Sequence, residues 1–553
     1  NSIADFQAGN YDSYELYQPA AGLSVNDIAA RWTYRQYSPF LQDTWQVNDK
    51  LSIQYGFRID IPDANPKPPY NADFAAAPPA GFGYTNNYTV SPSDKVFEPR
   101  FSFNYNFDTE LKTQLRGGIG LFQTDPPTVW LTNPYQNNGL TIVDYKYGFG
   151  ANRGCKATPA FSPDPHNQNV DNSPGCAVAG PVDTISSNFK LPTVWKATLA
   201  LDRELPWWNM VASAQYQHIQ VRDGIFYQAI NLGVPTGTLP DGRLQYWAIP
   251  GAAPKAKGNY AQYGDNVNFS NASTLLTNTG KGKSDSFTLS LSKPLSTNFF
   301  GNASFTLSHA TEVNSGGSSQ AFSNYQYVPR VNPNLDETGI SAYNIPRSLK
   351  LSLTWQHNFF GDYKTQVSAF YVGHDGLPYS WVYSGDTNGD GISYYDLAYI
   401  PKANDPLVSY GKASDQTIQQ FNDYLAHDSY LKNHRGEIAG RNAAHLPWSN
   451  QLDMSFVQEV PGFFKGNKGE LRFDVYNFLN LVNKNWGQVP YVQYQTRNLA
   501  GYNGVVDGQY VYTLPTDKNG NYQPTPVGIY ESGQNPTRVV SRWSTMITLR
   551  YTF

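Results

Sequence analysis

Apolar and polar side chains alternate along the last segment of the chain, residues 543–553. Trp543, Ile547 and Phe553 occupy one set of alternate positions, and Thr548 and Arg550 occupy the other. Successive side chains of a strand point to opposite faces, so this pattern predicts a strand with one apolar and one polar wall. A length of roughly ten residues with aromatic side chains near the end is typical of a strand that crosses a bilayer. The last strand of a soluble β-sandwich is the alternative.

The same alternation recurs in six earlier pairs of segments, each pair joined by a short turn. Leu51, Ile53 and Tyr55, for example, alternate with Ser52 and Gln54, which is the period of a strand. The expected strands lie at residues 32–47 and 51–60, 100–107 and 111–122, 193–204 and 210–222, 285–294 and 301–311, 349–359 and 364–372, 451–460 and 470–479, and finally 538–553.

Long connections separate these pairs. They span about residues 61–97, 123–190, 223–283, 312–345, 375–447 and 481–537, and several are longer than a compact soluble domain accommodates without secondary structure. Short turns at one end of a sheet and long loops at the other are typical of an outer-membrane barrel, with periplasmic turns and extracellular loops. The sequence therefore predicts an all-β fold, a transmembrane antiparallel β-barrel.

Composition favours the same class. Aromatic and charged residues each make up 15% of the chain, and the charged share is well below the roughly 25% usual for soluble proteins. The mean hydropathy is −0.51, and no run of apolar residues is long enough for a transmembrane helix. Tryptophans near expected strand ends, such as Trp355 and Trp381, would suit the aromatic girdles of a barrel. The net charge of −4 indicates no nucleic-acid-binding surface.

The expected strands number thirteen, whereas closed single-chain bacterial barrels have an even number. The chain also begins with loop-like sequence at residues 1–30. We therefore expect residues 1–553 to be the carboxy-terminal part of one larger barrel. An error of one strand in the count is the alternative explanation.

A series of motifs resembles, in order along the chain, the barrel of Oar-like TonB-dependent receptors. The motifs are residues 2–9 (SIADFQAG), 37–47 (YSPFLQDTWQV), 51–58 (LSIQYGFR), 116–122 (RGGIGLF), 191–206 (LPTVWKATLALDRELP), 434–436 (HRG), 446–453 (LPWSNQLD) and 473–480 (FDVYNFLN). Members of this family resemble one another in having 22 barrel strands around an amino-terminal plug, often preceded by a carboxypeptidase-regulatory-like domain. The resemblance implies that this chain holds the last 13 strands, and that the plug and the TonB-contacting segment lie before Asn1.

The resemblance also implies a function, that of a TonB-dependent active transporter and receptor in the bacterial outer membrane. Substrate would bind the extracellular loops, and the TonB–ExbB–ExbD complex would act on the plug to open the lumen, without covalent chemistry. Further implied partners are outer-membrane lipid, lipopolysaccharide and the barrel-assembly machinery, for which Leu549, Tyr551 and Phe553 would form the carboxy-terminal signal. A surface adhesion or protein-export barrel without nutrient uptake is the alternative. No loop motif identifies the substrate.

Residues 386–391, DTNGDG, form the most specific local motif. Oxygen-bearing side chains at Asp386, Asn388 and Asp390, followed by glycine, can surround a hard cation such as Ca²⁺. The carbonyl of Ile392 would add a ligand, and Asp396 stands one place before the position where an EF-hand has its bidentate glutamate. These five residues are a candidate calcium site. A polar turn is the alternative, because Asn-Gly and Asp-Gly favour turns.

Cys155 and Cys176 are the two cysteines of the chain, and both fall in one connection rich in Pro, Asn and Gly. Two isolated cysteines this close favour a loop disulfide formed in an oxidising compartment. Two free thiols are the alternative.

Residues 414–425 predict a short helix inside a long connection. Ile418, Phe421 and Leu425 recur at helical spacing, and Ser414 is a suitable N-cap. We expect this helix to pack within the loop, and a cover over the barrel mouth is the alternative.

The sequence shows no catalytic motif, and the eight histidines are scattered. His374 beside Asp375 could perform acid–base chemistry, but a structural pair at a strand end is the preferred interpretation. Charged side chains on the lumen face, such as Arg58, Arg116 and Arg472, are expected to pair with neighbouring acids or with a plug. An enzyme built on the barrel and a soluble multi-sandwich binding protein are the remaining hypotheses.

Overall fold

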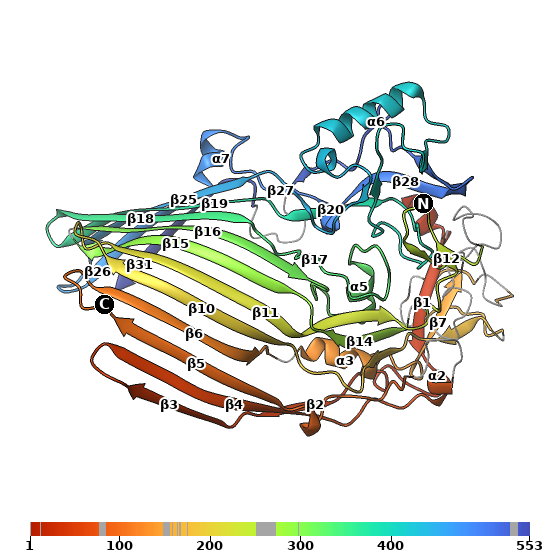
Figure 1. Ribbon diagram of the computed structural model, residues 1–553, viewed down its shortest axis with the longest axis horizontal. Coiled ribbons are helices and arrows are strands. Elements are labelled where there is room, and N and C mark those ends of the chain that lie inside the picture. Colours follow the sequence, from red (N-terminus) through yellow and green to blue (C-terminus); the bar gives the residue numbers. More distant parts are fainter. Residues whose placement is uncertain are drawn as a thin grey trace.

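Thirteen long antiparallel strands form one continuous sheet in the computed structural model (Figure 1). The model describes residues 2–11, 13–76, 84–125, 127–147, 155–156, 159–162, 164, 167–173, 175–249, 273–296, 298–530 and 540–553. The strands are β3 (Phe40–Gln46), β4 (Leu51–Asn65), β5 (Val96–Asn106), β6 (Thr113–Gln123), β10 (Thr193–Glu204), β11 (Val211–Ala229), β15 (Lys283–Ser296), β16 (Phe299–Glu312), β18 (Arg347–Phe360), β19 (Tyr363–His374), β25 (Ser449–Pro461), β26 (Lys468–Tyr476) and β31 (Ser544–Thr552). Each pairs with the next in this order. The all-β barrel architecture expected from the alternation is confirmed.

The sheet has two edges rather than a closed circumference. Over the described residues, β3 is bonded to β4 alone, and β31 to β26 alone. Both edge strands are largely exposed, with Trp45 at 56% and Leu549 at 79%. A bilayer offers no water to satisfy free backbone groups, so a sheet crosses lipid only as a closed barrel. Among the described residues, the thirteen strands therefore form a wall with two unpaired edges.

One face of the wall is apolar and exposed. The register places Leu199 opposite Tyr216, Leu289 opposite Phe305, and Phe473 opposite Ile547. Large exposed side chains follow this face from strand to strand and include Leu41, Tyr55, Phe101, Ile119, Leu199, Tyr216, Phe287, Leu289, Phe305, Leu353, Trp355, Phe456, Phe473 and Ile547. A continuous apolar surface of this extent is the surface that a membrane barrel turns toward lipid.

The opposite face is polar, and several of its charges are paired. Arg116 lies 2.8 Å from Asp202 on the neighbouring strand. Arg472 and Asp474, two places apart on β26, are also 2.8 Å apart. Charges within a barrel are costly in isolation, and mutual pairing lowers that cost. The expected pairing of lumen arginines with neighbouring acids is thus present.

Several strand boundaries differ from those expected. The first strand is divided into β2 (Thr33–Tyr37) and β3, because Pro39 lacks the N–H needed for a continuous ladder. The strand expected to reach residue 479 ends at Tyr476, because Asn477 turns the backbone into the left-handed region and α7 (Phe478–Val482) follows. β11 continues to Ala229, where it pairs with β14 (Thr274–Thr279). The last expected strand, 538–553, begins only at Ser544, and its first two residues, 538 and 539, lie outside the described residues.

The long loops contain helices and small sheets of their own. The helices are α1 (Ile3–Gln7), α2 (Ala72–Ala76), α3 (Thr128–Gln136), α5 (Ala321–Gln326) and α6 (Asp415–His427), with 3₁₀ turns at Pro92–Asp94, Leu431–Asn433 and Gln493–Gln495. One sheet joins β1 (Tyr14–Pro19), β7 (Ile142–Tyr147) and β8 (Ala177–Ala179), and another joins β22 (Val408–Ser409), β29 (Gln509–Thr513), β28 (Thr496–Val506), β20 (Pro378–Tyr383) and β24 (Ala444–His445). Shorter strands are β9 (Asp183–Ile185), β12 (Gly237–Thr238), β13 (Leu244–Gln245), β17 (Gly339–Ile340), β21 (Tyr399–Ile400), β23 (Glu437–Ile438), β27 (Pro490–Tyr491) and β30 (Gly528–Ile529). No helix within the described ranges is long and apolar enough to cross a membrane.

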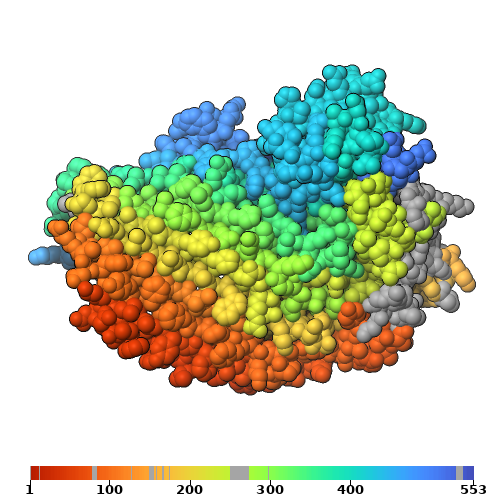
Figure 2. All heavy atoms as spheres, in the orientation of Figure 1, coloured from red at the N-terminus to blue at the C-terminus, as the bar shows by residue number. Residues whose placement is uncertain are grey.

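These loop elements pack into a layer at one end of the wall, which we call the loop layer. Figures 1 and 2 show segments from distant parts of the chain side by side at this end, opposite the tight turns. One buried cluster joins Trp381, Phe421 and Tyr512, and a second joins Phe189 and Tyr325. The loops therefore have hydrophobic cores of their own, which the alternation pattern does not reveal.

The expected loop helix is confirmed as α6. Ser414 is its N-cap, since its side chain accepts a hydrogen bond from the backbone N–H of Thr417 at 3.2 Å. Phe421 and Leu425 are fully buried in the first cluster. The girdle interpretation of Trp381 is wrong, because this side chain is fully buried in the same cluster instead of facing lipid.

Candidate functional site

The loop layer contains a partly open cavity of about 540 Å³ between three loops. Its lining comes from residues 322–327, 391–395 and 493–498, together with Thr525. These segments follow β16, β19 and β26 in the chain, so the cavity exists only because the three loops pack together. Its volume falls in the range of pockets that bind small molecules.

Tyrosine rings dominate the lining. The ring of Tyr327 stacks on that of Tyr494, with centroids 5.5 Å apart, and is tilted against that of Tyr395 at 5.4 Å. Tyr327, Tyr394 and Tyr494 are 45%, 51% and 61% exposed. These three rings are therefore partly open to solvent instead of filling a core.

Two of these tyrosines have a backbone conformation that disfavours them. Tyr394 has φ of 70° and Tyr494 has φ of 52°. The left-handed region costs an L-residue with a Cβ roughly 1–2 kcal/mol, and such strain is concentrated at functional sites. This conformational cost occurs here at two exposed aromatic residues of the same cavity.

The loops around the cavity are held by backbone hydrogen bonds. The N–H of Arg330 donates to the carbonyl of Tyr395, and the N–H of Leu397 donates back to the carbonyl of Arg330, both at 3.1 Å. The side-chain amide of Gln495 donates to the carbonyl of Ala342 at 2.9 Å. These contacts join the three loops to one another around the cavity.

The polar part of the lining is uncharged. The side chains of Gln326, Gln493, Asn498, Ser393 and Thr496 line the cavity, and no Asp, Glu, Lys, Arg or His is among its described lining residues. The three amides make no hydrogen bond with any other residue that the structure describes. Each amide keeps both donors and acceptors for a ligand.

The candidate calcium loop forms one border of the cavity. Asp386 accepts hydrogen bonds from the N–H groups of Gly389 at 2.7 Å and Gly391 at 2.8 Å. Gly389 and Gly391 have φ near +80°, which glycine adopts at no steric cost. The side-chain amide of Asn388 donates to Asp396 at 2.8 Å. The structure therefore brings Asp396 back onto the loop, as the sequence predicts.

Burial raises the pKa of the carboxyls in this loop. For Asp386 the loss of solvation is the largest cause, followed by repulsion from Asp390 and Asp396. The same loss of solvation raises the pKa of Asp396 to about 7. Trp247 covers the loop, and its indole N–H donates to the carbonyl of Thr387 at 3.0 Å.

The donor types in this loop suit a hard cation, but several are engaged within the loop. Both Asp386 oxygens and the Asn388 side chain make hydrogen bonds to loop residues. Among the described residues, the three loop carboxylates do not form a set whose ligand atoms lie within 4.8 Å of one another. Calcium binding at Asp386, Asn388, Asp390, Ile392 and Asp396 stays a prediction.

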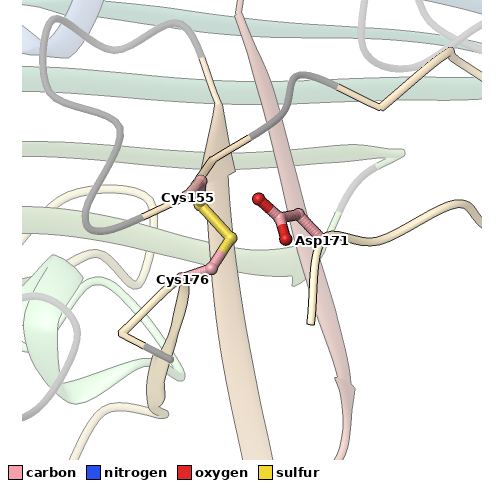
Figure 3. A group of neighbouring side chains, drawn as sticks. All are labelled: Cys155, Asp171 and Cys176. Atoms are coloured by element: carbon pink, nitrogen blue, oxygen red, sulfur yellow. A yellow bond between two sulfur atoms is a disulfide. The ribbon is translucent and has the colours of Figure 1, made fainter. Parts of the chain in front are cut away.

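The two cysteines lie close together beside Asp171 (Figure 3). A disulfide joins Cys155 to Cys176, next to the sheet of β1, β7 and β8. Asp171 accepts a hydrogen bond from the backbone of Lys156, and its own N–H donates to the hydroxyl of Tyr147 at 3.0 Å. Because the two sulfur atoms are bonded to each other, this group is a structural clasp and not a set of metal ligands.

Asp375 pairs with an arginine instead of with its neighbour. The guanidinium of Arg347 lies 2.7 Å from Asp375. His374 Nδ1 lies 2.6 Å from the carbonyl oxygen of Asp375, not from its carboxylate. This geometry supports the preferred interpretation of a structural pair at the strand end.

The carboxy-terminal strand presents its aromatic and apolar side chains outward. Leu549 and Phe553 are 79% and 97% exposed. The hydroxyl of Tyr551 accepts hydrogen bonds from the N–H of Phe463 at 3.0 Å and the amide of Asn467 at 3.1 Å. The role of these residues in barrel assembly stays a prediction.

The tyrosine cavity was not found from the sequence. Tyr327, Tyr394 and Tyr494 lie in three different loops, and spacing along the chain carries no signal of their meeting. The abundance of tyrosine in the loops was the one available indication.

Comparisons with known proteins identify the sheet. A family model described as "Outer membrane beta barrel domain" matches residues 1–496. No curated protein matches the chain. Among solved structures, a mutant of the ferric enterobactin receptor PfeA from Pseudomonas aeruginosa is 11% identical, with a TM-score of 0.39, over 94% of this chain and 45% of that one.

Two further structures have similar values. The copper transporter OprC is 10% identical, with a TM-score of 0.36, over 94% of this chain and 49% of that one. The siderophore receptor PirA from Acinetobacter baumannii is 11% identical, with a TM-score of 0.37, over 81% of this chain and 42% of that one. The chain thus spans about half the length of these structures or less.

Proposed function

The chain belongs to the outer-membrane β-barrel family, and from this we propose that it is the carboxy-terminal part of a gated barrel that imports a solute bound by its extracellular loops. The protein lies in the bacterial outer membrane. The proposed role involves binding and passage of the solute, without covalent chemistry.

The open sheet supports the proposal that this chain is part of a larger barrel. The free edges at β3 and β31 need strands to pair with, because unpaired backbone groups are not tolerated in lipid. An amino-terminal plug would occupy the lumen of the completed barrel and couple it to the TonB–ExbB–ExbD complex. No described residue is assigned to that coupling.

The observation that carries the transport function is the cavity in the loop layer. It has the volume of a small-molecule pocket, about 540 Å³, and three loops maintain it. An adhesion protein needs an extended outer surface, whereas uptake needs a concave site that admits a small solute. The concave shape and small-molecule volume of this cavity favour solute uptake over the adhesion and export alternatives.

The test is a growth and uptake comparison in the native host. A strain lacking the gene is compared with strains complemented by the full-length protein, in media where one nutrient at a time is limiting. We expect the complemented strain alone to grow on at least one scarce nutrient, and to lose this advantage when TonB is deleted. Unchanged growth on every nutrient, together with lost surface adhesion or protein secretion, would overturn the proposal.

A further inference from the structure

We infer that the tyrosine cavity binds a neutral, polyhydroxylated solute, with a short oligosaccharide as the chemical class that fits its lining. This inference adds a substrate class to the proposed import function. Its biological role rests on that proposed function, whereas the binding of the solute does not. The binding itself follows from the rings, the amides and the absence of charge in the described lining.

The rings supply the apolar part of the recognition. The face of an aromatic ring is electron-rich, so it attracts the C–H groups on the flat side of a sugar ring. Tyr327, Tyr394 and Tyr494 offer such faces on the wall of one cavity and are each about half exposed. Three rings in a single cavity suit a ligand with several ring-shaped units.

The backbone strain shows that the two outer rings are placed at a cost. A glycine or an asparagine would occupy the left-handed positions of Tyr394 and Tyr494 with less strain. The aromatic side chains therefore contribute nothing to the local turn that a smaller residue would not. Their exposure also excludes a role in the buried cores of the loop layer.

The polar side chains complement hydroxyl groups. A hydroxyl donates one hydrogen bond and accepts others, and an amide side chain can meet both needs. Gln326, Gln493 and Asn498 line the cavity with amides that no described residue engages. Gln326 lies on the loop after β16, and Gln493 and Asn498 lie on the loop after β26, so a bound sugar would be contacted by amides from two loops.

The uncharged lining disfavours charged ligands. An anion or a cation that entered the cavity would lose water without gaining an opposite charge, which is unfavourable. Asp390 and Asp396, which neighbour lining residues in the sequence, are 1% and 2% exposed and do not line the cavity. A neutral ligand with many hydroxyl groups avoids this penalty.

The experiment measures binding by the purified full-length protein in detergent, using isothermal titration calorimetry. The probes are neutral tri- and tetrasaccharides built from glucose, xylose, mannose or N-acetylglucosamine, and a trigalacturonate serves as the charged comparison. We expect at least one neutral oligosaccharide to bind and the trigalacturonate to bind at least about tenfold more weakly.

The variants are Tyr394→Asn and Tyr494→Asn, because asparagine tolerates left-handed backbone and the loops keep their fold. Each is expected to weaken binding about tenfold, the loss of one stacked ring. Tyr343→Asn is the matched control, since Tyr343 is 67% exposed in the same layer but does not line the cavity. Tyr494→Phe keeps the ring and is expected to bind as the wild type does.

Three results would overturn the inference: no neutral oligosaccharide binds, the charged one binds as well as or better than the neutral ones, or the asparagine variants bind normally. The outcome is separable from that of the proposed function. If oligosaccharides bind but the deletion strain has no uptake defect, the import function is contradicted and the binding site is supported. If another solute is taken up in a TonB-dependent way and no oligosaccharide binds, the oligosaccharide site is contradicted and the import function is supported.

Discussion

The guanidinium of Arg243 donates a 2.7 Å hydrogen bond to the backbone carbonyl of Leu397, 154 residues further along the chain. The same side chain makes two hydrogen bonds to Asp241, at 2.7 and 2.9 Å, and is fully buried. The ring of Tyr383 lies 5.5 Å from its charged end. The ion pair therefore holds Arg243 in place within the loop after β11, and the hydrogen bond of Arg243 to Leu397 ties this loop to the loop after β19.

Replacing Arg243 by methionine is expected to loosen this junction. Removal of one partner leaves the carboxylate of Asp241 buried and unpaired, which costs about 3–5 kcal/mol. Hydrogen exchange of residues 396–400 should become faster, while exchange of the barrel segment 454–458 stays unchanged. The double variant Arg243→Met/Asp241→Leu should recover much of the protection, and equal exchange in all three proteins would contradict the role of the ion pair.

The two edges of the wall can be tested by cysteine cross-linking in membranes. Arg472 and Thr548 are directly opposite on β26 and β31, so the pair Arg472→Cys/Thr548→Cys should form a disulfide on oxidation. Gln42→Cys/Thr548→Cys places one cysteine on each edge strand and should form none in the full-length protein. Efficient cross-linking of this edge pair would show that the thirteen strands close on themselves, and the larger barrel would be abandoned.

The loop layer should become less stable as the pH rises, because of the buried side chain of Asp183. Burial raises its pKa from an ordinary 3.8 to about 7, although Asn137 donates a 2.7 Å hydrogen bond to it. Between these values the folded protein holds a proton that the unfolded chain releases, so stability falls as the pH increases through this range. The full effect amounts to at most about 4 kcal/mol.

The measurement for Asp183 is hydrogen exchange of residues 183–185 and 274–276 between pH 5 and pH 8, corrected for the intrinsic rate. Protection should decrease with pH in the wild type and change little in Asp183→Asn, which keeps the size of the side chain without the charge. Parallel pH profiles for the two proteins would assign the effect to other groups.

The sequence-based prediction of calcium binding at residues 386–396 has a direct test. Addition of Ca²⁺ after chelator treatment is expected to slow exchange of this segment, because the ion would offset repulsion among Asp386, Asp390 and Asp396. Asp386→Asn/Asp390→Asn should abolish the response. Asp517→Asn is the matched control, since Asp517 accepts the N–H groups of Asn519 and Asn521 in a turn with similar hydrogen bonds that is less buried. If Ca²⁺ does not change hydrogen exchange of this segment in the wild type, the motif is a polar turn and not a calcium site.

The strands were predictable because their signals are local. Alternation along 193–204 and a short turn before 211 determine both strands of that pair, and the structure gives β10 the expected bounds. The break at Pro39 was missed because the alternation continues on both sides of it. The alternation of apolar and polar side chains carries no information about the loss of one backbone N–H donor.

The loop layer was not predictable because its contacts are distant in the chain. β20 pairs with β28 across more than a hundred residues, and this pairing buries Trp381. Seen in isolation, a tryptophan after a strand has the pattern of a residue at the membrane interface. The same limitation hid the cavity, whose rings come from three loops, whereas α6 was found because its apolar positions and its cap lie within fourteen residues.

The shared core of the loop layer determines whether antibodies recognise single loops and whether these loops can be grafted onto another protein. Phe421 of one loop and Tyr512 of another are buried in the same cluster, so neither loop has its native shape without the other. Antibodies raised against a peptide from a single loop should bind the denatured chain and fail on intact cells. A graft onto another barrel would have to carry the loops after β19 and β26 together.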